Sequence, residues 1–82
     1  MAQYMNRMNM PDSRVLQFHT GQVWVTSRGC LWRVERIEGG NAVLRRGFHG
    51  TGRINRKGVY DVGRWRLFYD PEYDDVVPKW HR

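Results

Sequence analysis

The sequence predicts an all-β fold, a small and strongly bent antiparallel barrel of about five strands. Three observations support this fold class. Several short segments alternate apolar and polar residues, which is the period-2 pattern of half-buried strands. Glycine-rich links separate these segments at close intervals, and no segment longer than one helical turn carries an apolar stripe. The 82 residues make a single domain, and so small a sheet needs closure to remove its open edges.

The N-terminal part begins with a polar, methionine-rich segment, residues 1–13, which we expect to be flexible. Residues 15–19 form either a short strand or an arm that enters the domain. Residues 22–26 alternate and predict a strand, with Trp24 on the face opposite its two valine neighbours. The barrel itself is expected to span residues 14–70.

The next two strands form a hairpin. Residues 30–38 are the longest predicted strand, and a β-bulge near Glu35 and Arg36 would return Ile37 to the core side. Gly39-Gly40-Asn41 then supplies the positive-φ positions of a tight turn. Residues 42–46 form the returning strand.

The C-terminal part contains two weaker strand signals. Residues 47–53 include three glycines and predict a mobile loop or a sharply bent segment. Residues 53–57 form a fourth strand, residues 58–63 a turn, and residues 64–70 a fifth strand. The chain then loses its periodicity, so residues 71–82 are expected to form an acidic and aromatic tail.

Charge is distributed unevenly along the chain, whose formal net charge is +6. Residues 14–69 hold eleven basic and three acidic side chains, whereas residues 70–82 hold two basic and four acidic ones. Twelve of the fourteen cations are arginine, which binds phosphate and carboxylate in a bidentate manner. This asymmetry indicates a polyanionic partner. The alternative is that the charge serves solubility alone.

Residues 20–46, "TGQVWVTSRGCLWRVERIEGGNAVLRR", resemble the opening of SH3-like barrels of Tudor and KOW type, and "VGRWRLF" resembles their closing strand. The resemblance implies a small SH3-like barrel. Tudor domains that bind methylated side chains combine an aromatic cage with an acidic residue, and no acidic residue adjoins Trp24, Trp32 or Phe48 in this sequence. The resemblance therefore implies the fold and leaves the ligand open.

The function predicted from these patterns is a non-enzymatic binding module, most simply one that binds nucleic acid through an arginine-rich face with little base specificity. Trp24 or Phe48 would provide a stacking platform for a base. The glycine loop would add an anion-binding nest of backbone N–H groups, or would be a plain hairpin loop. The arginines expected to contact phosphate are Arg33, Arg45, Arg46, Arg53, Arg56 and Arg66.

The sequence offers little for catalysis or metal binding, so we expect no enzyme activity, no cofactor and no metal. Cys30 is the single cysteine, which excludes an intramolecular disulfide and a four-cysteine zinc site. His19, His49 and His81 lack ligand spacing. No run of residues has the length and apolarity of a signal peptide or of a membrane span, which favours a cytoplasmic location.

Two alternative functions remain open. The excess of aromatic residues and Trp80 in the tail are compatible with a protein–protein interaction module, such as a small adaptor or a mobile-element protein that acts on a host factor. A small oligomeric enzyme built from barrel subunits is the third possibility, although a monomer or weak dimer is expected. The acidic tail either folds back on the arginine face, or docks on a partner through Trp80, or is disordered.

Overall fold

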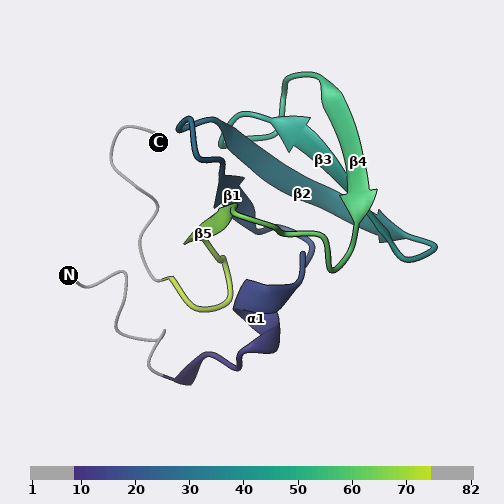
Figure 1. Ribbon diagram of the computed structural model, residues 1–82. Helices are drawn as coiled ribbons and strands as arrows, with labels where there is room; N and C mark the ends of the chain where they lie inside the picture. The colour runs from purple at the N-terminus through teal and green to yellow at the C-terminus, as the bar shows by residue number, and fades with distance from the viewer. Residues whose placement is uncertain (1–8, 75–82) are drawn as a thin grey trace.

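The structure, a computed structural model, describes residues 9–74, which form one helical turn and five strands (Figure 1). The elements in chain order are α1 (Ser13–Leu16), β1 (Val23–Val25), β2 (Leu31–Glu38), β3 (Asn41–Arg46), β4 (Ile54–Gly58) and β5 (Arg66–Tyr69). The strands form one antiparallel sheet in the order β4-β3-β2-β1-β5. The predicted all-β class with five antiparallel strands is confirmed.

The sheet does not close into a barrel, so the prediction of closure is wrong. β4 and β5 are the two edges, and they do not pair with each other. The intervening segment, the green trace between β4 and β5 in Figure 1, packs its apolar side chains against the core: Val59, Val62 and Trp65. Both edges carry charged residues, such as Lys57 on β4 and Arg66 on β5, and such charges oppose strand pairing. Side chains therefore cover the gap that backbone hydrogen bonds leave open.

The predicted bulge in the long strand is confirmed. Val34 pairs with Leu44, and the next paired residue of β2 is Arg36, which leaves Glu35 as the extra residue. Because of this extra residue, Ile37 lies opposite the buried Ala42 and so faces the core side of the sheet. Ile37 nevertheless keeps 39% of its surface exposed, and it lies beside the hairpin turn at the end of β2.

Residues 15–19 form no strand, and the alternative of an entering arm describes them. After α1, Phe18 turns into the core and is 1% exposed. Its backbone N–H donates to the carbonyl oxygen of Val59 at 2.8 Å. This segment therefore contributes a core side chain without joining the sheet.

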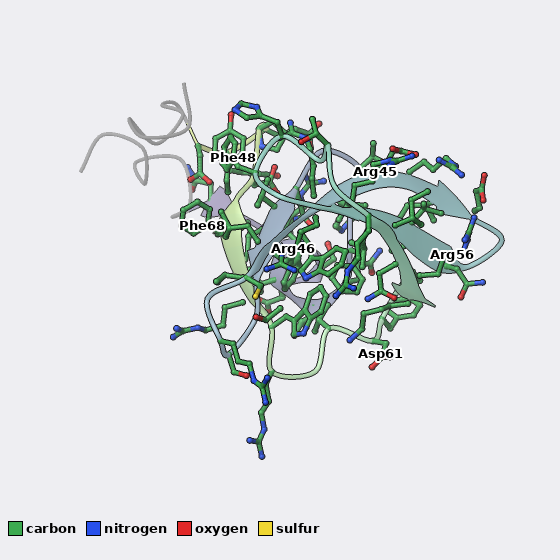
Figure 2. All side chains as sticks on the ribbon, turned by 90° about the horizontal axis from the view of Figure 1, so that it is seen from above. Arg45, Arg46, Phe48, Arg56, Asp61 and Phe68 are labelled. Carbon is green, nitrogen blue, oxygen red and sulfur yellow. The ribbon has the colours of Figure 1, made fainter. Side chains whose placement is uncertain are left out.

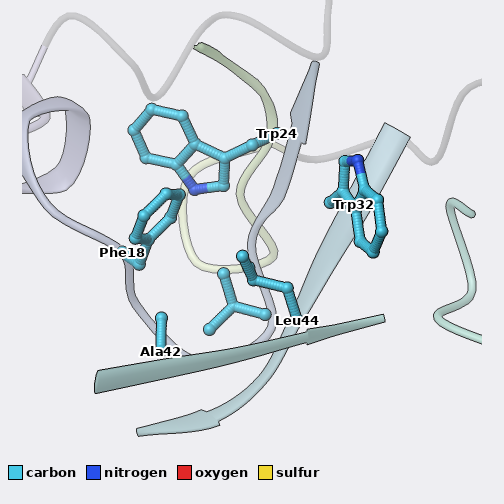
Figure 3. Packing of buried hydrophobic residues seen from close by; sticks show 6 residues of the cluster. Phe18, Trp24, Trp32, Ala42 and Leu44 are labelled. Carbon is cyan, nitrogen blue, oxygen red and sulfur yellow. The ribbon is translucent and has the colours of Figure 1, made fainter. Parts of the chain in front are cut away.

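The main core lies on one face of the sheet, which we call the inner face. It contains Phe18, Trp24, Trp32, Val34, Ala42 and Leu44. Figure 3 shows Phe18 and Trp24 at one side of this cluster and Trp32 at the other, with Leu44 between them. Each aromatic ring removes a large apolar area from water, which compensates for the small size of the domain.

A second, smaller core lies on the opposite face, which we call the outer face. Val23, Phe48 and Tyr69 form its buried centre, and Leu31 and Phe68 pack against it. Phe48 belongs to the loop between β3 and β4, so that loop folds back over the outer face. The sheet is therefore covered on both faces near β1, β2 and β5.

A buried polar network joins the two ends of the described chain. Arg14 donates to both carboxylate oxygens of Asp70, at 3.0 and 2.9 Å. Gln22 donates to Asp70 at 2.9 Å, and the backbone N–H of Asp70 donates to Asp74 at 2.7 Å. Glu72, the first acid of the predicted tail, also pairs with Arg14, and the folded unit extends to Asp74. Trp80 and the rest of the predicted tail, and most of the predicted N-terminal segment, lie outside the described residues.

Candidate functional site

Four arginines lie on the outer face of β2, β3 and β4: Arg33, Arg36, Arg45 and Arg56. Arg33 lies directly opposite Arg45, and Val43 lies between Arg36 and Arg56. Directly opposed residues share a face of the sheet, so strand alternation places these four side chains together. We call this group the outer arginine face; Figure 2 labels Arg45 and Arg56.

Glutamates neutralise part of the outer arginine face. Glu35 accepts a hydrogen bond from Arg45 Nε at 2.8 Å and also pairs with Arg36. Arg36 Nε donates to Glu38 at 2.6 Å. This hydrogen bond, aided by the charges of Arg36 and Arg56, holds the pKa of the Glu38 carboxyl below its usual value. The predicted arginine-rich face is therefore an ion-pair network with an excess of cations.

Two of the predicted contact residues hold the glycine loop in place. Arg33 Nη1 donates to the carbonyl oxygen of Phe48 at 2.8 Å, and its guanidinium lies 5.8 Å from the centre of that ring. Arg45 Nη1 donates to the carbonyl oxygen of Gly52 at 2.9 Å. Gly50 fits closely against Arg33, since a Cβ at this position would lie 3.1 Å from the Arg33 Cβ. Both guanidinium groups are thus partly committed to the fold.

The glycine loop is not a free nest of N–H groups. The backbone N–H of Gly47 donates to Leu31, that of Gly50 to Gly47, and that of Gly52 to Arg46. An anion would have to displace these internal hydrogen bonds. The structure therefore agrees with the second alternative predicted for this segment, a plain hairpin loop.

The two predicted stacking residues are buried, and that prediction is wrong. Trp24 is 1% exposed, and its indole N–H donates to Gln22 at 2.8 Å in the inner core. Phe48 is 5% exposed and packs against Tyr69 and Phe68, with ring centres 5.2 and 6.2 Å apart. Figure 2 shows Phe48 and Phe68 side by side at one end of the sheet. Because both faces are covered here, neither ring is available to a base.

Arg46 lies on the other side of the sheet from the outer arginine face, which corrects its predicted placement (Figure 2). It is opposite Trp32 in the ladder and so belongs to the inner face. Its guanidinium carbon lies 5.7 Å from the centre of the Trp32 ring, and Nη2 donates to Cys30 Sγ at 3.2 Å. Arg46 therefore extends over the rim of the inner core.

A stacked pair of tryptophans, the buried Trp32 and the partly exposed Trp65, adjoins Arg46. Trp32 and Trp65 stack with ring centres 6.2 Å apart and planes 19° apart. The ammonium of Lys57 lies 4.4 Å from the centre of the Trp65 ring. We call Trp32, Trp65, Arg46 and Lys57 the tryptophan–cation cluster. No local pattern in the sequence brings Trp65 and Lys57 together, so neither residue was predicted to belong to a site.

Most of the cations in the described part of the chain have no carboxylate partner there. This part contains eleven Lys and Arg residues, and three of them, Arg14, Arg36 and Arg45, form ion pairs. The other eight form none with a described residue: Arg28, Arg33, Arg46, Arg53, Arg56, Lys57, Arg64 and Arg66. Arg53, Arg56 and Arg66, three of the predicted contact residues, are exposed.

The described residues do not bring together three His, Cys, Asp or Glu side chains in an arrangement that could hold a metal ion. No helix within this part is long and apolar enough to cross a membrane. Cys30 is a free, half-buried thiol, and His19 Nε2 hydrogen-bonds with the carbonyl oxygen of Ser13. His81 lies outside the described residues.

No family model, curated protein or solved structure matches this chain.

Proposed function

We propose that this protein is a non-enzymatic module that binds nucleic acid, mainly through the phosphate backbone and with little base specificity. The observation that carries the proposal is the set of eight cations without a carboxylate partner among the described residues. Unpaired cations repel one another on so small a surface, and phosphates neutralise them while counterions are released from the nucleic acid. Arginine adds bidentate geometry to that attraction.

The exposed arginines are the proposed phosphate contacts. Arg53 precedes β4, Arg56 lies on the outer face of β4, and Arg66 begins β5, all with exposed side chains. Arg46 contributes from the inner face. Arg33 and Arg45 act differently, because their hydrogen bonds to the loop give them a positioning role.

The proposed relationship to Tudor and KOW barrels is compatible with a binding role, which the unpaired cations support independently of that relationship. A cytoplasmic location belongs to the same proposal. Cys30 is a free thiol, as is usual for proteins of reducing compartments.

Titration of labelled single- and double-stranded oligonucleotides at about 50 and 200 mM salt tests the proposal. The logarithm of the affinity should fall linearly with the logarithm of the salt concentration. Arg53→Gln and Arg56→Gln should each lower that slope by about 0.7–0.9. Leu16→Ser, an exposed position on α1, is the uncharged control and should bind as the wild type does. Absence of binding at low salt would refute the proposal.

A protein–protein interaction module is the second candidate, favoured by exposed apolar side chains and an open sheet edge. Ile54 on the β4 edge is 40% exposed and Tyr60 just beyond it is 73% exposed. An edge strand presents unpaired backbone groups to a partner strand. This candidate predicts that the wild type retains a specific protein in a pull-down and that the Ile54→Lys variant does not. If the wild type retains no protein, the result counts against this candidate.

A further inference from the structure

We infer that the tryptophan–cation cluster is a site for an unpaired base and its flanking phosphates, so that the module takes single-stranded nucleic acid in preference to duplex. This inference rests on the proposed function and identifies its substrate class. It is carried by the stacking of Trp32 on Trp65 with the cations of Arg46 and Lys57 beside the two rings.

The cluster lies where the inner face meets solvent. Lys57 is opposite Ala42, and Asn55 is opposite Leu44. The side chains of Lys57 and Asn55 therefore lie on the inner face of β4, next to the core residues of β3. Ala42 and Leu44 are fully buried, whereas Asn55 is exposed. Trp65 comes from the segment between β4 and β5 and is partly exposed. Polar and aromatic groups are thus accessible along this edge.

Trp65 is held in place by its neighbours. It stacks on Trp32, and its ring centre lies 6.0 Å from that of Phe18 in an edge-to-face arrangement. The Lys57 ammonium lies 4.4 Å from the centre of the Trp65 ring, and both side chains are partly exposed. A base stacks on an indole more strongly than an exposed ammonium does, so a base can replace the ammonium. The freed ammonium stays beside the ring and can pair with phosphate.

The cations of the cluster match the phosphates on either side of such a base. Arg46 Nη2 donates a hydrogen bond to Cys30 Sγ. A guanidinium has further N–H donors, which can bind a phosphate. Arg64 is exposed and adjoins Trp65 in the chain. No carboxylate of the described residues pairs with Arg46, Lys57 or Arg64, so the site is cationic and repels a methylated lysine or arginine.

Duplex nucleic acid cannot satisfy the same site. Its bases are stacked on one another and present only their edges, so no base face reaches Trp65 without unpairing. Duplex phosphates can still contact the exposed arginines elsewhere on the surface. The expected behaviour is therefore salt-sensitive binding to both forms, with an additional contribution from Trp65 for the single strand.

The experiment compares single-stranded poly-dT, poly-rU and a duplex of equal length by anisotropy. Trp65→Phe and Trp65→Leu should weaken single-strand binding, the leucine variant by about fivefold or more, and leave duplex affinity unchanged. Lys57→Gln should weaken the single strand more than the duplex. Arg56→Gln, the charge-matched control on the outer face, should weaken both forms to a similar extent.

The outcomes separate the two proposals. If the wild type binds neither form at low salt, the proposed function itself fails. If it binds and the ratio of single-strand to duplex affinity is the same in the Trp65 and Lys57 variants as in the wild type, the tryptophan–cation site is refuted and the proposed function stands. Circular dichroism checks the fold, and Lys57→Gln with Trp65→Phe decides the question should Trp65→Leu unfold.

Discussion

At the scale of single residues, Asp70 is the most constrained charge in the described chain. Its side chain is fully buried, and Arg14 holds both carboxylate oxygens. Burial opposes ionisation, but hydrogen bonds from Arg14, Gln22 and the backbone N–H of Glu72 outweigh it and hold the pKa of Asp70 below its ordinary value. The described residues contain no buried side-chain N or O atom without a hydrogen-bond partner. The charge is therefore stable in this position only while its partners remain.

Removal of Arg14 should be strongly destabilising. Arg14→Ala leaves the Asp70 carboxylate buried without its counterion, which costs about 3–5 kcal/mol. Urea unfolding at neutral pH measures the loss. Arg36→Ala, which removes an exposed ion pair with Glu38, is the control and should leave the unfolding midpoint near that of the wild type. Equal effects of the two substitutions would contradict the assigned role of the buried network.

The same network should make the fold sensitive to acid. The folded-state pKa of Asp70 is lowered, whereas the unfolded value is about 3.9, so the unfolded chain takes up a proton first as the pH falls. The contribution to the free energy of unfolding is complete above the unfolded pKa and decreases toward the folded pKa. Urea unfolding between neutral pH and about pH 3 should show this decrease, and Asp70→Asn should make it shallower. An unchanged pH dependence in the variant would contradict the prediction.

At the scale of elements, the hairpin of β2 and β3 explains how local sequence sets register. Glu38 pairs with Asn41, and the two intervening residues, Gly39 and Gly40, both have positive φ, +53° and +81°. A two-residue turn of this kind matches the twist of the strands. Asn41 was predicted to share this turn and instead begins β3. The turn and the bulge at Glu35 together decide which side chains of β2 reach the core.

Substitution in this turn should measure the cost of the positive-φ backbone conformation to stability, separately from any effect on packing. A Cβ at Gly39 or Gly40 would meet no atom within 4 Å, so any cost comes from the positive φ alone. Gly40→Val should destabilise the fold by about 1–2 kcal/mol. Gly39→Asn should be nearly neutral, because asparagine tolerates this conformation. Thermal unfolding of both variants checks the difference, and a neutral Gly40→Val would argue against the observed turn.

At the scale of the whole molecule, an incompletely closed sheet carries more positive charge than its own carboxylates neutralise. The outer arginine face is partly paired by Glu35 and Glu38, whereas the tryptophan–cation cluster lacks a carboxylate partner among the described residues. Both groups belong to a compact body with a radius of gyration of 12.0 Å. A polyanion that contacts this body can therefore engage several cations at once.

Binding should also appear as stabilisation of the folded state. A single-stranded oligonucleotide at about 100 times its dissociation constant should raise the free energy of unfolding by about 2.7 kcal/mol. High salt should abolish this increase, because it weakens the phosphate contacts. Thermal unfolding with and without the oligonucleotide at two salt concentrations measures the effect. An unfolding midpoint that does not respond at low salt would count against nucleic-acid binding.

Local pattern in the sequence was sufficient to predict the strands, the turn and the bulge, because these features depend on neighbouring residues. Alternation placed Arg33 with Arg45, and the predicted bulge returned Ile37 to the core side, as the ladder of β2 and β3 confirms. Alternation could not reveal that Trp24 and Phe48 are buried, since it states which residues share a face and not what covers that face. Nor could it bring Lys57 to Trp65.

The positions of the strands along the chain, the glycine turn and the excess of arginine were thus determined by the sequence itself, through periodicity and composition. The tertiary structure alone decided that the sheet stays open, that the glycine loop covers the outer face, and that Arg46 lies with the tryptophans. These features depend on contacts between segments distant in the chain, such as Phe48 with Tyr69 and Phe18 with Trp65. Contacts of this kind have no local signature, because they exist only once the sheet has brought the segments together.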